Sequence, residues 1–398
     1  MRILVLHNRE LRRGGEATAF EEEAAALRSR GHEVLAVEKR NADFESAGIA
    51  KKVLLAVWSL FNLPAFFHLL RVLRRFRPDV AVVHNAFPLW STAAYFAFFA
   101  RGIPVVQVVH NYRLRCLNGL YFREGAPCTL CERGRWWQGV RHRCVRGSRI
   151  WSLAYGLITQ SVWPLGVVRR ISRFKVMAEF VRTRLIAMGV AHEKIEVVPN
   201  FVPDLWMQSA EAAVPTWVYI GRLAPEKGIH IAVEAFALGA PGRLIVIGSG
   251  SLEGQLRERV ARERLPVDFC GHVDGPQRFE LLRSAWALVC PSLSFETGGP
   301  LVIREAFSVG VPVVASDVGT LPEYVIEGMN GRLVPPADPN ALAQILRELA
   351  ENRFERRRLA DGALRETQTR LSPARVLEEL EGLLARAASV GRKAPFGT

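Results

Sequence analysis

The chain has 398 residues, which exceeds what one ordinary hydrophobic core supports and predicts two domains of nearly 200 residues each. Its hydrophobic share of 49% and its charged share of 23% are those of a globular protein, which excludes the disordered and fibrous classes. The net charge of +14 is uneven, because residues 1–200 carry 31 Lys and Arg against 15 Asp and Glu, whereas residues 201–398 carry 22 against 24. This basic excess indicates an anionic partner for the first half, such as lipid headgroups, a phosphorylated lipid or nucleic acid, unless the chain simply uses arginine freely.

Short apolar runs alternate with helical patterns along the whole chain. The first run is followed by Gly14-Gly15 and by a helical pattern that Gly31 ends. Strands are predicted in the first half at residues 2–7, 33–38, 79–84, 103–110, 173–178 and 194–200. Strands are predicted in the second half at residues 216–221, 243–248, 267–271, 285–292 and 311–316.

This alternation is typical of doubly wound parallel sheets, so the sequence predicts an α/β fold with two Rossmann-like domains. The first domain is predicted at residues 1–200, with an insert at 111–147, and the second at residues 201–372. A C-terminal helix at 373–398, with Ser372 as its N-cap, is expected to pack back on the first domain.

Two apolar stretches in the basic half, residues 53–70 and 150–168, are almost long enough to span a bilayer. Polar residues and prolines interrupt both, so packed helices are expected, with partial insertion into a membrane surface as the alternative. The apolar run at the N-terminus is too short for a secretory signal. We therefore expect a cytoplasmic protein, at most peripheral on the inner face of the cell membrane.

Two loops that follow predicted strands have the composition of phosphate-binding loops. Gly14 and Gly15 open a helix, so backbone N–H groups and the helix dipole can face a phosphate. Arg222 and Lys227 flank a proline just before another helix, where two cations oppose the helix dipole. A diphosphate between the two cations would explain them, and two solvated cations are the alternative.

A third loop lies in "PSLSFETGGPLVIREAF", residues 291–307, between a predicted strand and a predicted helix. Gly298, Gly299 and Pro300 shape this loop, and Glu305 lies in the first turns of the helix. A carboxylate at that place can accept two hydrogen bonds from a ribose diol, while Glu296 at the mouth of the loop can bind sugar hydroxyls. The alternative is a plain strand-to-helix turn with capping carboxylates.

These three segments resemble the nucleotide-sugar-dependent glycosyltransferases of family 4, which are retaining enzymes with the GT-B fold. The resemblance is carried by "RGGEATAFEEEAAALRSRGHEV", "GRLAPEKG" and "PSLSFETGGPLVIREAFSVGVPVVAS", and it extends from the first strand to about residue 370. It implies two Rossmann-like domains that face each other across a cleft. The resemblance further implies roles for single residues, namely diphosphate contacts for Gly15, Arg222 and Lys227, ribose binding for Glu305, donor-sugar contact for Glu296 and a place beside the reacting centre for His110.

One departure from the family pattern concerns Glu296. Family members usually have seven residues between the two glutamates, and this chain has eight. The helix that follows anchors Glu305, so Glu296 is expected to be displaced, with the backbone amides of Gly298 and Gly299 taking over part of its role.

The resemblance implies front-face substitution with retention, in which the leaving diphosphate helps to deprotonate the acceptor hydroxyl. No second carboxylate in the basic half is clearly placed as a nucleophile. Arg222 and Lys227 would balance the charge of the leaving group, so no metal is expected for the chemistry.

The insert at 111–147 contains four cysteines and shows no clear helix or strand pattern. Four thiols in a reducing compartment suit a structural zinc ion, with buried thiols or a redox function as the alternatives and His142 as a competing ligand. The candidate ligands are Cys116, Cys128, Cys131 and Cys144. Residues 111–150 also contain nine arginines against two glutamates, which suggests a clamp for a phosphate-bearing acceptor.

The sequence therefore predicts a retaining hexosyltransferase that acts on a nucleoside-diphosphate sugar. Its expected acceptor is a bacterial cell-surface or exopolysaccharide glycan on a lipid-phosphate carrier, held by the basic half, and an anionic membrane surface is a further expected partner. One alternative is a sugar-nucleotide epimerase of the same fold. Another is a noncatalytic protein that binds a nucleotide sugar, whereas nucleic-acid binding is not expected, because interleaved aromatic and basic residues are confined to 111–150.

Overall fold

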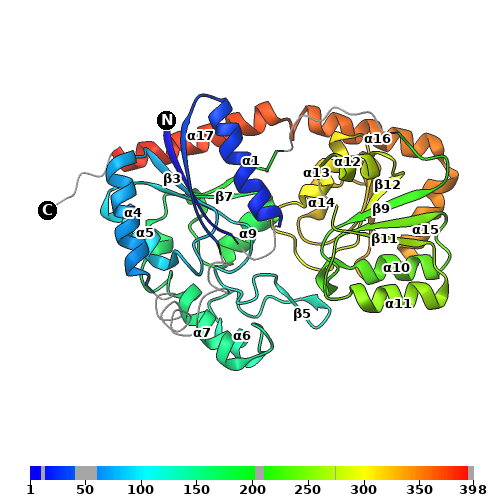
Figure 1. The fold of residues 1–398 in the computed structure, drawn as a ribbon, viewed down its shortest axis with the longest axis horizontal. Coiled ribbons are helices and arrows are strands. Elements are labelled where there is room, and N and C mark those ends of the chain that lie inside the picture. Colours follow the sequence, from blue (N-terminus) through cyan, green and yellow to red (C-terminus); the bar gives the residue numbers. More distant parts are fainter. Residues whose placement is uncertain (10–13, 41–60, 202–209, 274, 393–398) are drawn as a thin grey trace. The chain divides into compact units, whose positions relative to one another are not determined.

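The computed structural model describes residues 1–9, 14–40, 61–201, 210–273 and 275–392. The chain divides into two compact units (Figure 1). The first unit comprises residues 1–120, 129–198 and 377–398, and the second comprises residues 121–128 and 199–376. The division after Val198 lies close to the predicted boundary, but the second unit also contains a short piece of the predicted insert.

The first unit contains a six-stranded sheet in which all neighbouring strands are parallel. In spatial order the strands are β2 (Glu33–Arg40), β1 (Arg2–Arg9), β3 (Val80–Val83), β4 (Val105–Val108), β7 (Arg173–Val176) and β8 (Ile195–Val197). Ile3 of β1 pairs with Val34 on one side and with Val80 on the other. The apolar runs of β1 and β3 are buried, as expected for parallel strands that are covered on both faces.

Helices surround this sheet, and local sequence signals start several of them. They are α1 (Gly15–Ser29), α4 (Leu63–Phe76), α5 (Ser91–Ala100), α6 (Trp137–Arg141), α7 (Arg149–Gln160), α8 (Val167–Arg170), α9 (Glu179–Ala187) and α17 (Pro373–Arg392), with a short 3-10 helix at His192–Lys194. Asn62 caps α4 by accepting a hydrogen bond from the Ala65 amide at 2.9 Å. Ser148 caps α7 in the same way.

The second unit contains another parallel six-stranded sheet. In spatial order the strands are β11 (Val267–Gly271), β10 (Arg243–Ile247), β9 (Thr216–Ile220), β12 (Ala287–Cys290), β13 (Val313–Ser316) and β14 (Gly331–Val334). Its helices are α10 (Ile229–Ala237), α11 (Glu253–Glu263), α12 (Gly275–Arg283), α13 (Leu301–Ser308), α14 (Leu321–Tyr324), α15 (Pro339–Glu351) and α16 (Arg353–Gln368). In its core the rings of Trp217 and Trp286 meet edge to face with their centroids 6.1 Å apart.

Helices cover both faces of this second sheet. Helix α10 packs with α11 and α15, whereas α13 packs with α12 and α16. Figure 1 shows α10 and α11 on one side of the sheet and α12, α13 and α16 on the other. The predicted α/β class with two parallel-sheet domains is therefore correct.

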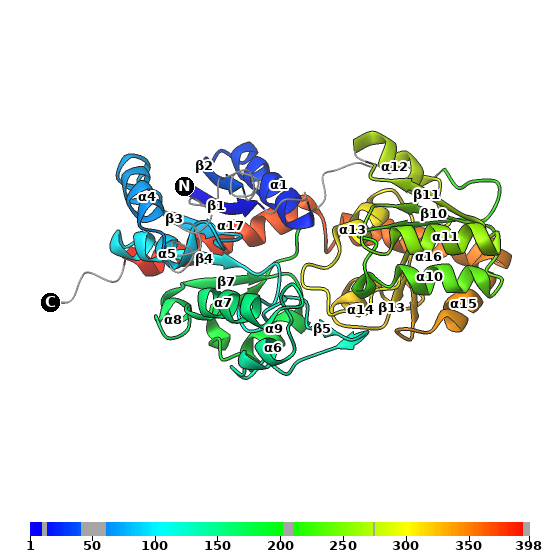
Figure 2. The ribbon, with the colours of Figure 1, turned by 60° about the horizontal axis from the view of Figure 1, so that its bottom comes forward.

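Helix α17 contributes its residues from Leu377 onward to the first unit. Arg30 at the end of α1 donates to Glu381 at 3.2 Å, and Arg386 forms an ion pair with Glu196 of β8. Figure 2 shows α17 running beside α1, β1 and β3.

The predicted insert has more regular structure than its sequence pattern indicated. Strands β5 (Phe122–Arg123) and β6 (Ala126–Pro127) form a short antiparallel hairpin, and α6 follows in the first unit. The hairpin escaped prediction because two-residue strands are too short for any periodicity.

Candidate active site

The segment that carries Arg222 and Lys227 is held against the loop after β12 through a glycine. A 3-10 helix at Pro225–Lys227 ends at Gly228, which has a φ of 66° and precedes α10. A Cβ atom on Gly228 would lie 1.8 Å from the carbonyl oxygen of Pro291. Only glycine therefore allows these two loops to approach so closely.

The two predicted phosphate-binding cations contact carboxylates of the protein itself. Lys227 Nζ donates to both oxygens of Glu296 at 2.7 and 2.8 Å, and the Ser292 hydroxyl donates to Oε1 of the same carboxylate at 2.8 Å. Arg222 lies 2.7 Å from Glu226 and has a side chain that is 57% exposed. The sequence argument that these cations call for an external anion is therefore incomplete, because Glu226 and Glu296 also neutralise them.

Glu305 lies in the middle of α13 and is buried. Arg278 of α12 donates to its Oε1 at 2.6 Å, while its Oε2 is buried and forms no hydrogen bond within the described part of the chain. Burial raises the pKa of Glu305, although Arg278 and Arg304 oppose the shift. A buried carboxylate oxygen without a hydrogen bond lowers the stability of the folded protein. Such an oxygen is typical of a site where a bound ligand donates the missing hydrogen bond.

The loop before α13 is fixed by Arg304, which sequence analysis did not single out. Arg304 is completely buried and donates to the carbonyl oxygens of Gly298, Gly299 and Asn200 at 3.4, 3.0 and 2.8 Å. Gly299 has a φ of 51°, and a Cβ there would lie 2.2 Å from the ring of Tyr324. The loop geometry thus depends on a glycine and on one buried arginine.

In the first unit, Gly14 is the N-cap of α1 and Gly15 is its first residue. Gly14 has a φ of −130°, which any residue adopts, and a Cβ there would meet no atom within 4 Å. Neither backbone strain nor crowding explains this glycine, and both glycines are exposed. Residues 10–13, immediately before them, lie outside the described part of the chain.

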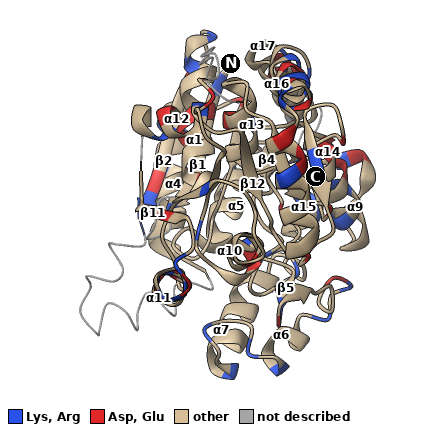
Figure 3. Cartoon of the chain, turned by 90° about the vertical axis from the view of Figure 1, so that its right-hand side faces the viewer, with Lys and Arg blue, Asp and Glu red and all other residues tan. Residues whose placement is uncertain are grey.

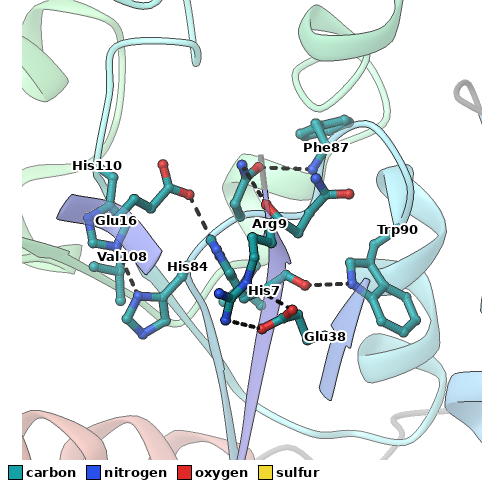
Figure 4. Close-up of polar contacts among 12 residues, drawn as sticks. His7, Arg9, Glu16, Glu38, His84, Phe87, Trp90, Val108 and His110 are labelled. Carbon is teal, nitrogen blue, oxygen red and sulfur yellow. Dashed lines mark hydrogen bonds and ion pairs between the residues drawn. The ribbon is translucent and has the colours of Figure 1, made fainter. Parts of the chain in front are cut away.

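Three histidines gather at the carboxyl edge of neighbouring strands. His7 belongs to β1, His84 directly follows β3, and His110 follows β4 two residues after its end. His84 Nδ1 and His110 Nε2 are 2.9 Å apart, and Glu16 of α1 lies 3.7 Å from His7 Nδ1 (Figure 4). Ligands bind beyond this edge in open α/β sheets, and His110 lies at this edge.

A buried ion pair lies next to His84. Glu23 of α1 contacts Lys175 of β7 in a short hydrogen bond and lies 3.4 Å from His84 Nε2. Burial raises the pKa of Glu23, but the attraction of Lys175 and His84 outweighs it and holds the pKa well below its usual range. Burial, together with the nearby His84 and Lys175, lowers the pKa of His110 well below its ordinary value, so His110 is neutral at pH 7.

These charges also orient the proton on each imidazole ring. When His84 is neutral, a carboxylate beside its Nε2 favours the tautomer with the proton on that nitrogen, which leaves Nδ1 as an acceptor. His110 Nε2 then donates to His84, and His110 Nδ1 becomes the acceptor. Sequence analysis missed Glu23, although its spacing from Phe20, Ala24 and Leu27 puts it on the buried face of α1.

A cavity opens next to His110 in the first unit. Polar groups of His84, Asn85, Gln107 and Arg113 line it, and the rest of its wall is largely aliphatic, including Val108, Val162, Val167, Val168 and Ile171. Tyr95 donates to Gln107 at 2.6 Å and fixes this amide in the wall. A concave, mostly apolar space with a few placed polar groups is typical of a small-molecule site.

The four cysteines of the insert are the candidate ligands of the predicted zinc ion. Within the described residues, no group of three or more His, Cys, Asp or Glu is arranged to hold a metal ion. Cys128 falls in the second unit and the other three in the first, and the Cys116 thiol donates to Asn118 at 2.9 Å. A structural zinc ion therefore stays a prediction for metal analysis of the purified protein.

Two further findings concern the remaining cysteines and the apolar helices. Cys270 is exposed, whereas Cys290 is buried and burial raises the pKa of its thiol to about 12. Over the described ranges, no helix has the length and apolarity to cross a membrane. Residues 53–60 of the first apolar stretch lie outside these ranges.

Two family models match the chain. The model described as Glycosyltransferase Family 4 matches residues 13–204, and the model described as Glycosyl transferases group 1 matches residues 214–352. Together they cover most of the chain and correspond closely to its two halves.

Relatives and solved structures agree with these models. The chain is 31% identical over 182 residues to the amylovoran biosynthesis glycosyltransferase AmsK of Erwinia amylovora. The matched region covers 42% of this chain and 45% of that protein. The chain is 35% identical over 305 residues to a glycogen synthase of Mycobacterium tuberculosis, covering 73% of this chain and 64% of the synthase. The chain thus spans less than two thirds of the length of either relative.

A solved structure shows the same fold over nearly the whole chain. The crystal structure of Anabaena HepE in complex with UDP matches with a TM-score of 0.69 at 20% identity, covering 97% of this chain and 100% of that one. The two family models lead to one conclusion: the chain carries a glycosyltransferase family 4 domain at residues 13–204, followed by a glycosyl transferases group 1 domain at residues 214–352.

Proposed function

We propose that the protein is a retaining glycosyltransferase that moves a hexosyl group from a nucleoside-diphosphate sugar to an acceptor bound by the first unit. The observation that carries the donor assignment is Glu305, a buried carboxylate whose Oε2 has no hydrogen-bond partner within the described residues. A ribose diol supplies two hydroxyl donors for such a carboxylate. HepE, which shares the fold, binds UDP and UDP-glucose, which supports a nucleotide-sugar donor here.

In the proposed donor complex, the diphosphate lies against Lys227 and Arg222. An ammonium group has three N–H donors, and Lys227 makes two hydrogen bonds to Glu296. A diphosphate would compete for Lys227, and the Glu296 carboxylate would then be able to accept hydrogen bonds from sugar hydroxyls. This exchange gives Glu296 a role in spite of the extra residue between it and Glu305.

The chemistry proposed is front-face substitution. The bond between the anomeric carbon and the diphosphate breaks, the acceptor oxygen bonds to the same face of that carbon, and a diphosphate oxygen takes the acceptor proton. Lys227 and Arg222 stabilise the charge that develops on the leaving group, so no metal is needed in this proposal. Neutral His110 positions a hydroxyl group through hydrogen bonding and does not act as a cation.

The acceptor is proposed to be a bacterial cell-surface or exopolysaccharide glycan on a lipid-phosphate carrier. The cavity beside His110 supports a small-molecule site in the first unit, and the basic excess of residues 1–200 supports a phosphate-bearing ligand. AmsK, whose name refers to amylovoran biosynthesis, supports the class of product.

Incubation of the protein with UDP-, GDP- and ADP-sugars tests the proposal. Release of nucleoside diphosphate, slow without acceptor and faster with it, is the expected result, and NMR of the product should show the anomeric configuration of the donor. An isomerised donor without diphosphate would identify an epimerase instead. If no nucleotide or nucleotide sugar raises the melting temperature, the donor assignment is wrong.

A further inference from the structure

Helix α7 exposes its apolar side and buries its small and polar side. Its exposed face carries Ile150, Leu153, Ala154 and Leu157, which follow the i, i+3, i+4, i+7 spacing of one helical stripe. The large side chains of this stripe are 81%, 46% and 51% exposed at Ile150, Leu153 and Leu157, and the adjacent Trp151 is 54% exposed. We call Ile150, Trp151, Leu153, Ala154 and Leu157 the α7 face.

The opposite side of α7 is small and polar, and it is the buried one. It consists of Ser152, Gly156, Thr159 and Gln160. The Ser152 hydroxyl accepts from the Val145 amide at 3.0 Å, and Gln160 donates to the Arg113 carbonyl at 3.1 Å. These bonds tie α7 to loop backbone on both of its ends.

Close packing at Gly156 fixes the same orientation. A Cβ on Gly156 would lie 2.6 Å from the ring of Trp136, so only glycine allows that ring to seat against the helix. Rotating α7 to bury its apolar stripe would break these contacts and bury leucines where glycine is required. The exposure of this face therefore follows from specific packing, and α7 is not a loosely attached helix.

The chain segment that contains the α7 face has basic residues but no acidic ones. Residues 133–178 contain nine arginines and one lysine and no aspartate or glutamate. The exposed arginines of this segment that lie close to α7 in sequence are Arg141, Arg143, Arg146, Arg149, Arg169 and Arg170. Figure 3 shows the basic residues at α6 and α7, and the guanidinium of Arg146 stacks 5.1 Å from the Trp151 ring at the edge of the face.

An apolar stripe with aromatic and arginine residues at its rim fits an anionic lipid surface. A second copy of the chain fits poorly, because a twofold contact puts the same surface on both sides and would bring arginines opposite arginines with no acid in the segment to neutralise them. We propose that the α7 face docks the first unit onto anionic phospholipid membranes, with its leucines and Trp151 entering the headgroup boundary. This inference concerns a surface apart from the donor residues, so it stands or falls independently of the proposed reaction.

Co-sedimentation with vesicles tests the proposal. The full-length protein should bind vesicles of POPC with 30 mol% POPG and should bind POPC vesicles much more weakly. Leu153→Gln/Leu157→Gln, which keeps helix-forming side chains, should weaken binding to the POPG vesicles roughly thirtyfold. Arg146→Gln/Arg149→Gln should weaken it roughly tenfold or more and should reduce its dependence on salt.

The matched control is Phe354→Ala, which removes a side chain that is 79% exposed on the second unit. It should leave vesicle binding unchanged. Unchanged melting temperatures of all variants verify that the fold is intact, and release of diphosphate from donor sugar in the absence of vesicles reports the reaction separately.

Results of two kinds would overturn the proposal. One is a wild-type protein that does not bind the POPG vesicles, or a double leucine variant that binds them as tightly as the wild type. The other is a wild-type dimer in analytical ultracentrifugation that Leu153→Gln/Leu157→Gln converts into a monomer, because the α7 face would then be a protein interface.

Discussion

The change Glu305→Gln tests the proposed nucleoside site directly. The carboxylate accepts from Arg278 at 2.6 Å through Oε1, and its buried Oε2 is the atom available to a ribose diol. Glutamine keeps one acceptor oxygen and replaces the other by a donor amide, so at least one hydrogen bond to a charged acceptor is lost. Such a bond contributes about 1.5–3 kcal/mol, and we therefore expect nucleotide affinity to fall roughly ten- to hundredfold.

The same change should not lower stability at pH 7. Burial raises the pKa of Glu305, so the folded state binds its proton more tightly than the unfolded state. The resulting stability is fully present below the unfolded pKa of about 4.3 and is lost as the pH rises through the folded pKa. Above the folded pKa the wild-type carboxylate no longer gives this contribution, and a neutral glutamine avoids the penalty of burying a charge.

Isothermal titration calorimetry with UDP, GDP and ADP measures the affinity, and thermal melting measures the stability. The matched control is Glu366→Gln, because Glu366 is also a buried glutamate of the second unit that contacts an arginine, Arg370. It should leave nucleotide affinity unchanged. Equal nucleotide affinity of Glu305→Gln and the wild type would show that Glu305 does not hold the nucleoside.

Three other substitutions have expected results that follow from the described contacts. Lys227→Ala should lower turnover by about 100-fold, the scale of one lost transition-state donor, and near-wild-type turnover in a diphosphate-release assay would contradict its role. Glu23→Gln should lower the free energy of unfolding at pH 7 by about 3–5 kcal/mol, because Lys175 stays buried without its carboxylate, whereas Glu21→Gln on the same helix should have a small effect. Because the pKa of Glu23 is lowered, its contribution to stability is present above about pH 4.3 and is lost as the pH falls further. The free energies of unfolding of the wild type and Glu23→Gln, measured in urea, should therefore lie closer together near pH 3 than at pH 7. A difference that stays constant would refute the pairing. Gly299→Ala should destabilise the second unit by about 1–3 kcal/mol, because its φ is 51° and its Cβ would meet Tyr324, while Gly254→Ala in α11 should be neutral or stabilising in the same melts.

The strand pattern allowed the fold class to be predicted. Continuous apolar runs such as that of β1 are readable because parallel strands are buried on both faces, and every strand of the two sheets falls at a predicted run apart from β14. The hairpin of β5 and β6 was missed because four paired residues carry no period. The cysteine count suggested a zinc site, but a count does not give the positions of the sulfur atoms, so this site stays a prediction.

The sequence allowed some residues of the candidate site to be named but not their contact partners. Glu305 and Lys227 were named from the segments that follow β12 and β9, where ligands of α/β proteins bind, and His110 was named from the family resemblance. Their partners were not named. Arg278 and Arg304 contact the site from α12 and α13, and Glu23 reaches His84 from α1, which no local motif reports.

The sequence alone determined which segments become strands and helices, since periodicity and turn residues act within a few positions of one another. The tertiary structure alone decided which charges meet: it joined Lys227 to Glu296 across 69 positions and Glu23 to Lys175 across 152. It also decided that α7 turns its leucines outward, because the fit of Trp136 at Gly156 and the hydrogen bonds of Ser152 and Gln160 fix the helix more specifically than apolar burial would. Contacts between distant segments depend on how the whole chain packs, and a local pattern carries no information about that packing.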